Sequence, residues 1–341
     1  MPWWIGVPSS FSFAVVVASL GCATPSPTSA TLFHPAPEAP AATATATATA
    51  RSADDAAVVD VGAPASADAA IEARDSSATA NAAPQGMLLV PAGPFTMGAD
   101  SGGEGDEHPA HTVTLPAFWL DTTEVTNEAY ATCVGAKVCR PRALVAAASH
   151  AGPEANFARP RQPVVGVSWD DAKAYCAWMG RRLPREAEFE KAIRDGDARR
   201  YPWGNDPPTP ERTVFARQMG HDATDEVGAH PSGRGPYGHD DLAGNVWEWI
   251  DDEYDPIAYQ RPTAESGVPG TCSEIMAAQR KLRADGNQGF TGSNPIPDEC
   301  EHVLRGGAFN YDAFGLRSTN RVHHPARFHL VMSGFRCAKD G

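Results

Sequence analysis

The pattern of apolar and polar positions predicts strands first and helices later in the main body of the chain. Residues 87–98 form an apolar run broken by a Pro-Ala-Gly turn, which predicts a β-hairpin. A further strand is expected over residues 111–115. Thr126 is a suitable N-cap for a helix over residues 127–134, and Gly135 is typical of a helix end.

A second helix is predicted after Ser168, because Asp171 can complete a capping box with it and Gly180 would end the helix. The apolar residues that recur at helical spacing are Trp169, Ala172, Tyr175, Cys176 and Met179. Pro184 suits the first turn of another helix, which should run to about Ile193. Turn residues dominate beyond it. We therefore expect an α+β domain with little regular secondary structure, held by long loops, aromatic side chains and disulfides.

The N-terminal residues predict export. Residues 11–20 form an apolar stretch of the length of a signal-peptide core, too short to span a bilayer as a helix. The stretch ends in Ser-Leu-Gly-Cys, which resembles a lipobox, so Cys22 would be lipidated; ordinary cleavage is the alternative. We expect residues 1–22 to be a signal peptide. The protein would then lie in the cell envelope, anchored to a membrane by lipid and facing the periplasm or the exterior.

Composition divides the remainder into a tether and one folded domain. Residues 23–85 are dominated by Ala, Pro, Thr and Ser and cannot bury enough apolar surface to offset the entropy of ordering. They are predicted to be a disordered tether, and residues 86–340 to form one globular domain. The chain has 28 basic and 42 acidic side chains, a balance that argues against nucleic acid as a partner.

Seven cysteines occur, and six remain if the lipobox cysteine is lipidated. An even number in an exported protein predicts three disulfides, although six cysteines allow fifteen pairings that spacing alone does not separate. The candidate pairs are Cys133 with Cys139, Cys272 with Cys300, and Cys176 with Cys337. The first pair would close a local loop and the second would bracket an insertion at about residues 257–302. The third would then tie an internal helix to the C-terminus.

A series of motifs resembles the formylglycine-generating enzyme (sulfatase-modifying factor) family. In the family's order they are Pro91 to Gly98, Thr123 to Asn127, Pro163 to Trp169, Gly180 to Glu190, Tyr201 to Asn205, Asp241 to Trp249, Arg305 to Gly307 and Gly334 to Cys337. The match covers about 250 residues. It implies the family's variant of the C-type lectin-like fold, low in regular secondary structure, and a disulfide between Cys176 and Cys337.

The same resemblance implies that the catalytic cysteines are missing. In active members two cysteines, five apart, follow the Gly-Gly motif, bind copper and oxidise a sulfatase cysteine to formylglycine with oxygen. Tyr311 and Leu316 stand at these positions, and Ala308 replaces the serine that usually follows the glycines. Neither a phenol nor an isobutyl group replaces a thiolate as copper ligand and exchange partner. We therefore expect no formylglycine-generating activity, no catalytic residue and no copper.

The resemblance also implies a structural Ca²⁺ site in the Asp-Leu-Ala-Gly-Asn-Val-Trp-Glu motif. Its ligands would come from Asp241, Gly244, Val246 and Glu248, the mixture of carboxylates and carbonyls that a hard cation prefers. The alternative is that the two acids cap turns while the neighbouring tryptophans pack the core. A second calcium site of the family is not predicted, because Val214 stands where its polar ligand is expected.

Other candidate binding residues lie outside these motifs. By resemblance, the family's substrate groove would be lined by Arg317, Asn320 and Arg321, where arginine can hold a carboxylate or peptide backbone; structural salt bridges are the alternative. Further candidate metal ligands are His108, His111, His323, His324, His329 and the acidic run Asp251, Asp252, Glu253 and Asp255. No cluster combines histidine and carboxylate at ligand spacing. We expect solvated or hydrogen-bonded histidines and a solvated acidic loop.

The sequence favours a non-enzymatic binding or scaffolding module, tethered to a membrane and stabilised by calcium. It would present a groove to an unknown peptide, protein or glycan, because the scaffold motifs are intact while the catalytic positions are vacant. The alternative is an oxidoreductase of the same type with altered chemistry, for which Tyr311 and Asp312 are the residues to suspect. A purely structural envelope protein has no positive signal beyond the tether.

Overall fold

The computed structural model describes residues 83–143, 156–218, 222–261, 267–268, 270–286 and 298–341. All of them belong to one compact unit that starts at Ala73. The expected signal peptide, the lipidation site Cys22 and nearly all of the expected tether lie outside the described residues. Within the described part of the chain, no helix has the length and apolar composition needed to cross a membrane.

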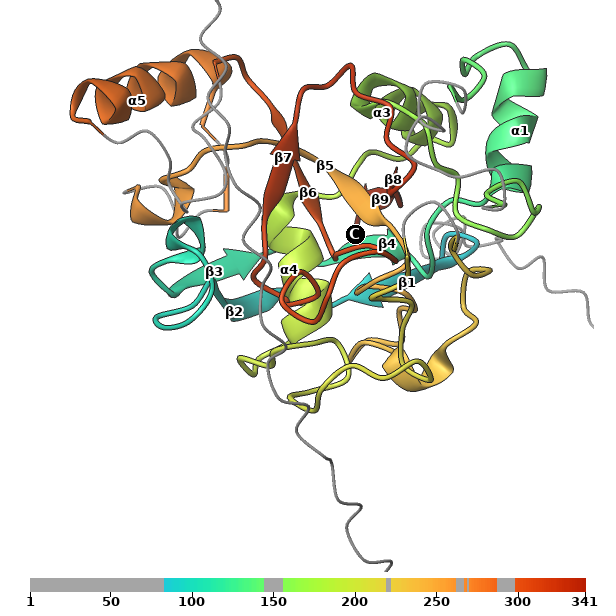
Figure 1. Cartoon of the computed structure of the whole chain (residues 1–341), viewed down its shortest axis with the longest axis horizontal. Helices are drawn as coiled ribbons and strands as arrows, with labels where there is room; N and C mark the ends of the chain where they lie inside the picture. Colours follow the sequence, from blue (N-terminus) through green and yellow to red (C-terminus); the bar gives the residue numbers. More distant parts are fainter. Residues whose placement is uncertain (1–82, 144–155, 219–221, 262–266, 269, 287–297) are drawn as a thin grey trace, which may run out of the picture. The chain divides into compact units, whose positions relative to one another are not determined.

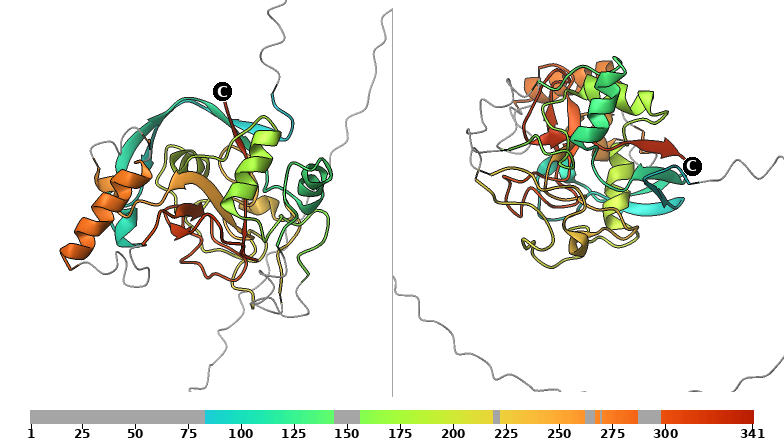
Figure 2. Two further views of the ribbon diagram at one scale, coloured as in Figure 1. Left: turned by 90° about the horizontal axis from the view of Figure 1, so that it is seen from above. Right: turned by 90° about the vertical axis from the view of Figure 1, so that its right-hand side faces the viewer.

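The first four strands form one long bent hairpin. They are β1 (Met87–Val90), β2 (Gly93–Met97), β3 (His111–Leu115) and β4 (Phe118–Asp121). β1 pairs with β4, and β2 pairs with β3, in one continuous antiparallel register: Met87 faces Asp121, and Met97 faces His111. Figure 2 shows this ribbon as an arch that curves over the rest of the domain.

The prediction that the Pro-Ala-Gly segment turns a hairpin was wrong. β1 and β2 do not pair with each other, because the chain continues in the same direction through Pro91 and Ala92. Proline has no N–H to donate to a ladder, so this segment interrupts the pairing and bends the ribbon instead of reversing it. The reversal lies between β2 and β3, in a loop that contains the 3-10 helix η1 (Gly105–Glu107).

Two helices, α1 (Asn127–Gly135) and α3 (Trp169–Trp178), begin where local capping signals predict them. α1 is capped by Thr126, and α3 by the reciprocal pair Ser168 and Asp171. α4 (Glu186–Arg194) starts two residues beyond Pro184, so proline precedes the helix and is not in its first turn. α5 (Cys272–Ala284) was not predicted, although its Thr271 and Glu274 form a capping box within the expected insertion.

A mixed sheet forms the second half of the fold. Its order is β7 (Val322–His324), β6 (His302–Arg305), β5 (Trp247–Glu253) and β8 (Ser333–Gly334), while β9 (Ala338–Asp340) adds to the β1–β4 pair. The remaining elements are the 3-10 helices η2 (Pro231–Gly233) and η3 (Ala258–Gln260). Only β8 runs parallel to its neighbour. Long loops join these short strands (Figure 1).

The helix α4 contacts both halves, because it packs against β2 of the arch and against β5 and β6 of the sheet. Its Phe189 and Ile193 are fully buried in the same apolar cluster as Val113, Phe118 and Ile250. Burial of one such large side chain contributes roughly 2–3 kcal/mol. A second cluster lies between α1, α3 and β5 and includes Trp247 and Trp249, both buried. Both tryptophan rings thus pack in the core, as the alternative to a calcium site expected of them.

The three expected disulfides are confirmed. They join Cys133 to Cys139, Cys176 to Cys337, and Cys272 to Cys300. The second bond spans 161 residues and ties α3 to the segment before β9. A crosslink that closes so long a loop strongly restricts the unfolded chain.

Candidate functional site

The loop that follows β6 carries the two positions expected for the catalytic cysteines. Arg305, the last residue of β6, is fully buried, and its guanidinium donates to the carbonyl oxygens of Ser318 at 2.6 Å and Thr319 at 3.1 Å. It therefore closes residues 306–317 into a loop at its base. We call this segment the vacant-cysteine loop.

Glycine is required at the start of the vacant-cysteine loop. Gly306 and Gly307 have φ angles of 97° and 84°, in the left-handed region that favours glycine. A Cβ atom on Gly307 would lie 2.6 Å from the Leu316 side chain and 2.9 Å from the carbonyl oxygen of Gly315. The two limbs of the loop therefore pack directly against each other, which holds Leu316 in place.

The two vacant positions are filled by packed side chains. The Tyr311 ring is half-buried and lies edge-on to Trp247, with the ring centroids 5.1 Å apart. Leu316 is 1% exposed and packs against Tyr201 and Ala243. Between them Phe314 is exposed, and the Arg317 guanidinium lies 3.9 Å from the centre of its ring.

This arrangement does not fit copper. A copper centre of the family's type needs thiolates, and every cysteine of the described residues is bound in one of the three disulfides. The vacant-cysteine loop offers a phenol and an isobutyl group at the corresponding positions. We therefore assign no redox step to this loop.

Arg317 leads from the loop into a buried ion-pair network. Its guanidinium holds Glu107 of η1 with two bonds of 2.5 and 2.7 Å, and Thr319 and Asn320 also donate to this carboxylate. Burial alone would raise the pKa of Glu107, but the hydrogen bonds from Arg317 and Thr319 outweigh it and lower the pKa. Two of the expected groove residues, Arg317 and Asn320, thus converge on one carboxylate.

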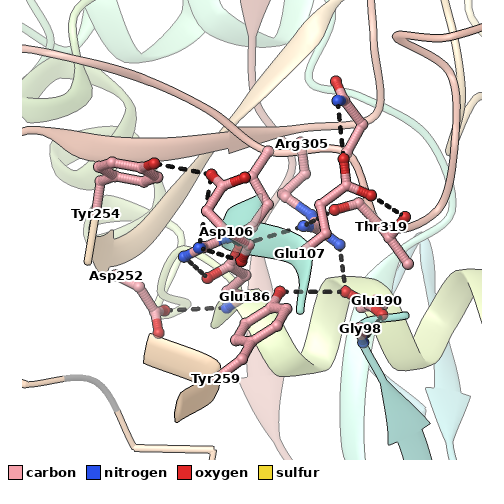
Figure 3. Close-up of polar contacts among 12 residues, drawn as sticks. Gly98, Asp106, Glu107, Glu186, Glu190, Asp252, Tyr254, Tyr259, Arg305 and Thr319 are labelled. Carbon is pink, nitrogen blue, oxygen red and sulfur yellow. Dashed lines mark hydrogen bonds and ion pairs between the residues drawn. The ribbon is translucent and has the colours of Figure 1, made fainter. Parts of the chain in front are cut away.

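The acids of α4 continue the network, as Figure 3 shows. Arg305 pairs with Glu190 at 2.5 Å and with Glu186 at 3.2 Å, and all three side chains are buried. Arg321, the third expected groove residue, is 1% exposed and holds Glu186 with two bonds of 2.7 and 2.9 Å. Burial raises the pKa of Glu186, but Arg321 and Arg305 more than offset this, so the pKa is lowered. Arg321 accordingly forms structural salt bridges in the interior.

Two tyrosines cover this network. Tyr254 donates to Asp106 at 2.8 Å, and Arg321 lies 5.1 Å from the centre of its ring and 4.7 Å from that of Tyr259. Burial, reinforced by nearby carboxylates, raises the pKa of both tyrosines, so both hydroxyls remain protonated donors. The network is therefore shielded from solvent by aromatic rings.

The prediction that residues 251–255 form a solvated acidic loop was wrong. Asp251 and Asp252 lie on β5, and side chains of a strand alternate between its faces. Asp252 is 6% exposed and accepts a hydrogen bond from the Glu186 amide at the start of α4. Burial, together with the charge of Glu186, raises its pKa to about 8. Asp255 is also buried and pairs with Arg261.

The segment with the expected calcium ligands has an irregular backbone. Asp241, Gly244 and Asn245 have φ angles of 56°, 82° and 61°, so the chain turns sharply before β5. A loop of this kind can direct backbone carbonyls toward one point, as a Ca²⁺ site needs. Glu248 is fully buried, and both of its oxygens accept from Arg336 at 2.7 Å.

Three buried carboxylates face one guanidinium near this segment. They are Glu124, Asp241 and Glu248, and burial raises the pKa of each while Arg336 opposes the rise. Oε2 of Glu124 is buried and has no hydrogen-bond partner among the described residues. A carboxylate has about four lone-pair positions, so the pairing with Arg336 leaves acceptors for a cation. In donor type, the carboxylates of Asp241 and Glu248 and the carbonyls of Gly244 and Val246 match what a hard cation prefers.

The histidines singled out in the sequence do not form a metal cluster within the described part of the chain. His108 and His111 contact backbone carbonyls, and His323 pairs with Glu301 at 2.5 Å. Among the described residues, one group of three potential ligand side chains converges: Glu253, Cys272 and Cys300. Its cysteines are joined in a disulfide, so they are not thiolate ligands.

Sequence reasoning missed the carboxylates that organise the site. Glu107, Glu186 and Glu190 pair with arginines that lie 115–210 residues away in the chain, and Glu190 also pairs with Arg194 of its own helix. The available signal was the spacing of Glu186 and Glu190, four apart on one helical face beside the buried Phe189. That spacing indicates a shared face but does not identify the partners.

The fold and the site define an α+β domain of the formylglycine-generating-enzyme type in which the loop after the Gly-Gly motif lacks cysteines. The chain belongs to the sulfatase-modifying factor enzyme 1-like domain family, whose family model matches residues 72–341. This confirms the expected family and its α+β fold with little regular secondary structure, a variant of the C-type lectin-like fold.

The relatives include a protein named as a formylglycine-generating enzyme and one named as inactive. The chain is 35% identical over 240 residues to the formylglycine-generating enzyme of Streptomyces coelicolor, covering 55% of this chain and 75% of that enzyme. It is 34% identical over 215 residues to the inactive C-alpha-formylglycine-generating enzyme 2 of Bos taurus, covering 49% and 71%. The solved structure of PvdO from Pseudomonas aeruginosa matches with a TM-score of 0.53 and 26% identity, covering 75% of this chain and 94% of that one.

Proposed function

We propose that this protein is an exported, membrane-anchored binding or scaffolding module that has no formylglycine-generating activity. The observation that carries the proposal is the packing at the two vacant positions. Tyr311 stacks edge-on against Trp247, and Leu316 is buried between the limbs of its own loop. A side chain committed to apolar packing neither binds copper nor exchanges with a substrate thiol.

A groove ligand is supported by what remains exposed around the vacant-cysteine loop. Phe314 is 45% exposed at its tip, with Arg317 behind the ring. Exposed aromatic residues next to arginine are typical of binding surfaces for peptides, proteins or glycans. The anchor is supported by the apolar stretch of residues 11–20 and by Cys22 at its end.

Structural calcium is part of the same proposal. Its support is the excess of buried carboxylates over guanidinium groups around Asp241 and Glu248, together with the Glu124 oxygen that has no hydrogen-bond partner in the described part of the chain. A divalent cation would neutralise this excess and fix the turn that precedes β5. No chemical step depends on it.

The direct test is co-expression with a peptide that carries a sulfatase motif, followed by mass spectrometry of the peptide cysteine. The Streptomyces coelicolor enzyme under the same conditions, with added copper, is the positive control. We expect complete conversion of the cysteine to formylglycine in the control and none with this protein. Conversion above that of a strain without either enzyme would refute the proposed loss of activity.

The alternative, an oxidoreductase with altered chemistry, is separated by metal analysis of the purified protein. Stoichiometric copper or iron, together with oxygen uptake that is lost in Tyr311→Phe, would favour that alternative over the binding module. The expected result is calcium in stoichiometric amounts and no oxygen uptake. The phenylalanine variant keeps the ring against Trp247 and removes only the hydroxyl, so it serves as the matched control for packing.

A further inference from the structure

A cavity of about 240 Å³ lies beside the vacant-cysteine loop and is lined by four arginines. They are Arg194 from the end of α4, Arg199 and Arg200 from the segment after it, and Arg317. None of the described residues that line the cavity is Asp or Glu. Such a lining is unusual in a chain with a formal net charge of −14, so the cavity is a local exception to the charge of the protein.

Three of the four arginines are already matched by carboxylates outside the cavity. Arg194 pairs with Glu190 at 2.8 Å, and Arg199 forms a fork with Asp197 at 2.6 and 2.7 Å. The third, Arg317, pairs with Glu107 in the network described above. These pairs fix the guanidinium groups in position. Since an arginine has five N–H donors, some of them have no partner among the residues that the structure describes. Nε of Arg194 is buried without a partner among the described residues.

Arg200 is the fourth arginine of the cavity lining. It is exposed, and no carboxylate of the described residues lies within ion-pair distance of its guanidinium, which sits 5.6 Å from the ring centre of Tyr201. Tyr201 packs against Leu316, so this ring connects the cavity to a vacant catalytic position. The cavity therefore has one uncompensated positive charge at its rim and pre-positioned guanidinium donors in its wall.

Residues 99 and 101–103 of the loop between β2 and β3 form a further part of the lining. Gly102 and Gly103 have φ angles of 70° and 69°, and a Cβ on Gly103 would collide with the Glu107 and Arg317 side chains. The loop is held by a hydrogen bond of 2.7 Å between His108 and the carbonyl oxygen of Gly102. With glycine at residue 103, the backbone approaches the Glu107–Arg317 pair closely, and the two glycines themselves place no side chain in the cavity.

We propose that this cavity binds an oxyanion: the phosphate, sulfate or carboxylate group of a ligand. The guanidinium fork matches the geometry of such groups with two parallel hydrogen bonds. This proposal specifies the chemistry of the ligand for the binding function proposed above, and its biological role rests on that function. Oxyanion binding itself is measured independently of formylglycine formation. The detection of formylglycine would refute the proposed function and leave this site untouched.

The test is thermal unfolding of the full chain as a function of inorganic phosphate, sulfate or malonate, with ionic strength held constant by chloride. A ligand that binds the folded state raises the melting temperature in a saturable manner, from which the apparent Kd follows. Comparison of the three anions separates tetrahedral from planar oxyanions. The variant is Arg200→Gln, which should fold normally because this side chain is exposed and forms no ion pair with a described residue.

The matched control is Arg327→Gln, which removes the same charge from an arginine that is exposed and does not line the cavity. We expect at least one anion to saturate, with Kd raised about tenfold or more in Arg200→Gln and unchanged in Arg327→Gln. A linear, unsaturable response to all three anions in the wild-type protein would overturn the proposal. So would equal weakening in the two variants, because the response would then report net charge rather than this cavity.

Discussion

Replacement of Arg336 by methionine tests whether one guanidinium supports the turn that precedes β5. The Arg336 side chain is fully buried and holds both oxygens of Glu248 at 2.7 Å. It also donates to the carbonyl oxygens of Asp240 and Asp241, both at 3.1 Å. Methionine fills most of the volume but leaves the Glu248 carboxylate buried without its partner.

Breaking a buried ion pair from one side costs about 3–5 kcal/mol, because the remaining charge is desolvated and unpaired. The two carbonyls lose donors as well, which adds to the loss. For a domain of this size we expect Tm to fall by roughly 6–20 °C for Arg336→Met. The assay is thermal and urea unfolding of the oxidised protein, followed by near-UV circular dichroism. The control, Arg327→Met, breaks an exposed pair and should change the free energy of unfolding by less than about 1 kcal/mol.

The pH dependence of this loss has a defined sign. In the folded state burial already raises the pKa of Glu248, and removal of Arg336 would raise it further. The folded variant then binds a proton that the unfolded chain has released, so its free energy of unfolding falls as pH rises. The destabilisation should therefore be largest at neutral and alkaline pH and smaller in acid. A loss below about 1 kcal/mol at pH 7, or one that grows as pH falls, would refute this account of the pair.

Two further predictions concern buried carboxylates. Burial and the charge of Glu186 raise the pKa of Asp252 to about 8. The stability contributed by protonation of Asp252 is therefore present in full below the pKa of the unfolded chain and is lost as pH rises through 8. Asp252→Asn should flatten the dependence of the free energy of unfolding on pH over this window, measured by urea unfolding. Calcium at 100 times its Kd should stabilise the protein by about 2.7 kcal/mol relative to chelator. The gain should vanish in Asp241→Asn and persist in Asp251→Asn; an equal gain in both would exclude the proposed site.

Local signals in the sequence predicted local structure well. A helix cap depends only on residues next to the helix start. Thr126 and the Ser168–Asp171 pair were therefore sufficient to locate the starts of α1 and α3. The cysteine pairs were also identified, because an even number in a chain that is expected to be exported and the family resemblance restrict the pairings. These features depend on neighbouring residues or on covalent chemistry.

The arch and the ion-pair network depend on contacts that sequence spacing does not reveal. Pro91 bends the ribbon and does not reverse it, because the preceding strand β1 pairs with β4, which begins 27 residues after Pro91. The same applies to Asp252, whose place on β5 under the amide of Glu186 makes it a buried acid rather than part of a solvated run. In both cases tertiary packing overrides the local composition.

The vacant-cysteine loop is held by contacts that need no thiol at residues 311 and 316. Arg305 closes the loop from one end through the carbonyls of Ser318 and Thr319, and Arg317 anchors the other end to Glu107. Neither anchor involves residue 311 or 316, and the glycines that let the limbs meet precede both. The shape of the loop is thus set by arginine–carboxylate pairs and glycine conformation, not by metal coordination. Tyr311 and Leu316 supply no thiolate for copper, while Phe314 is exposed beside the arginine-lined cavity; on these features we base the proposal of a binding function.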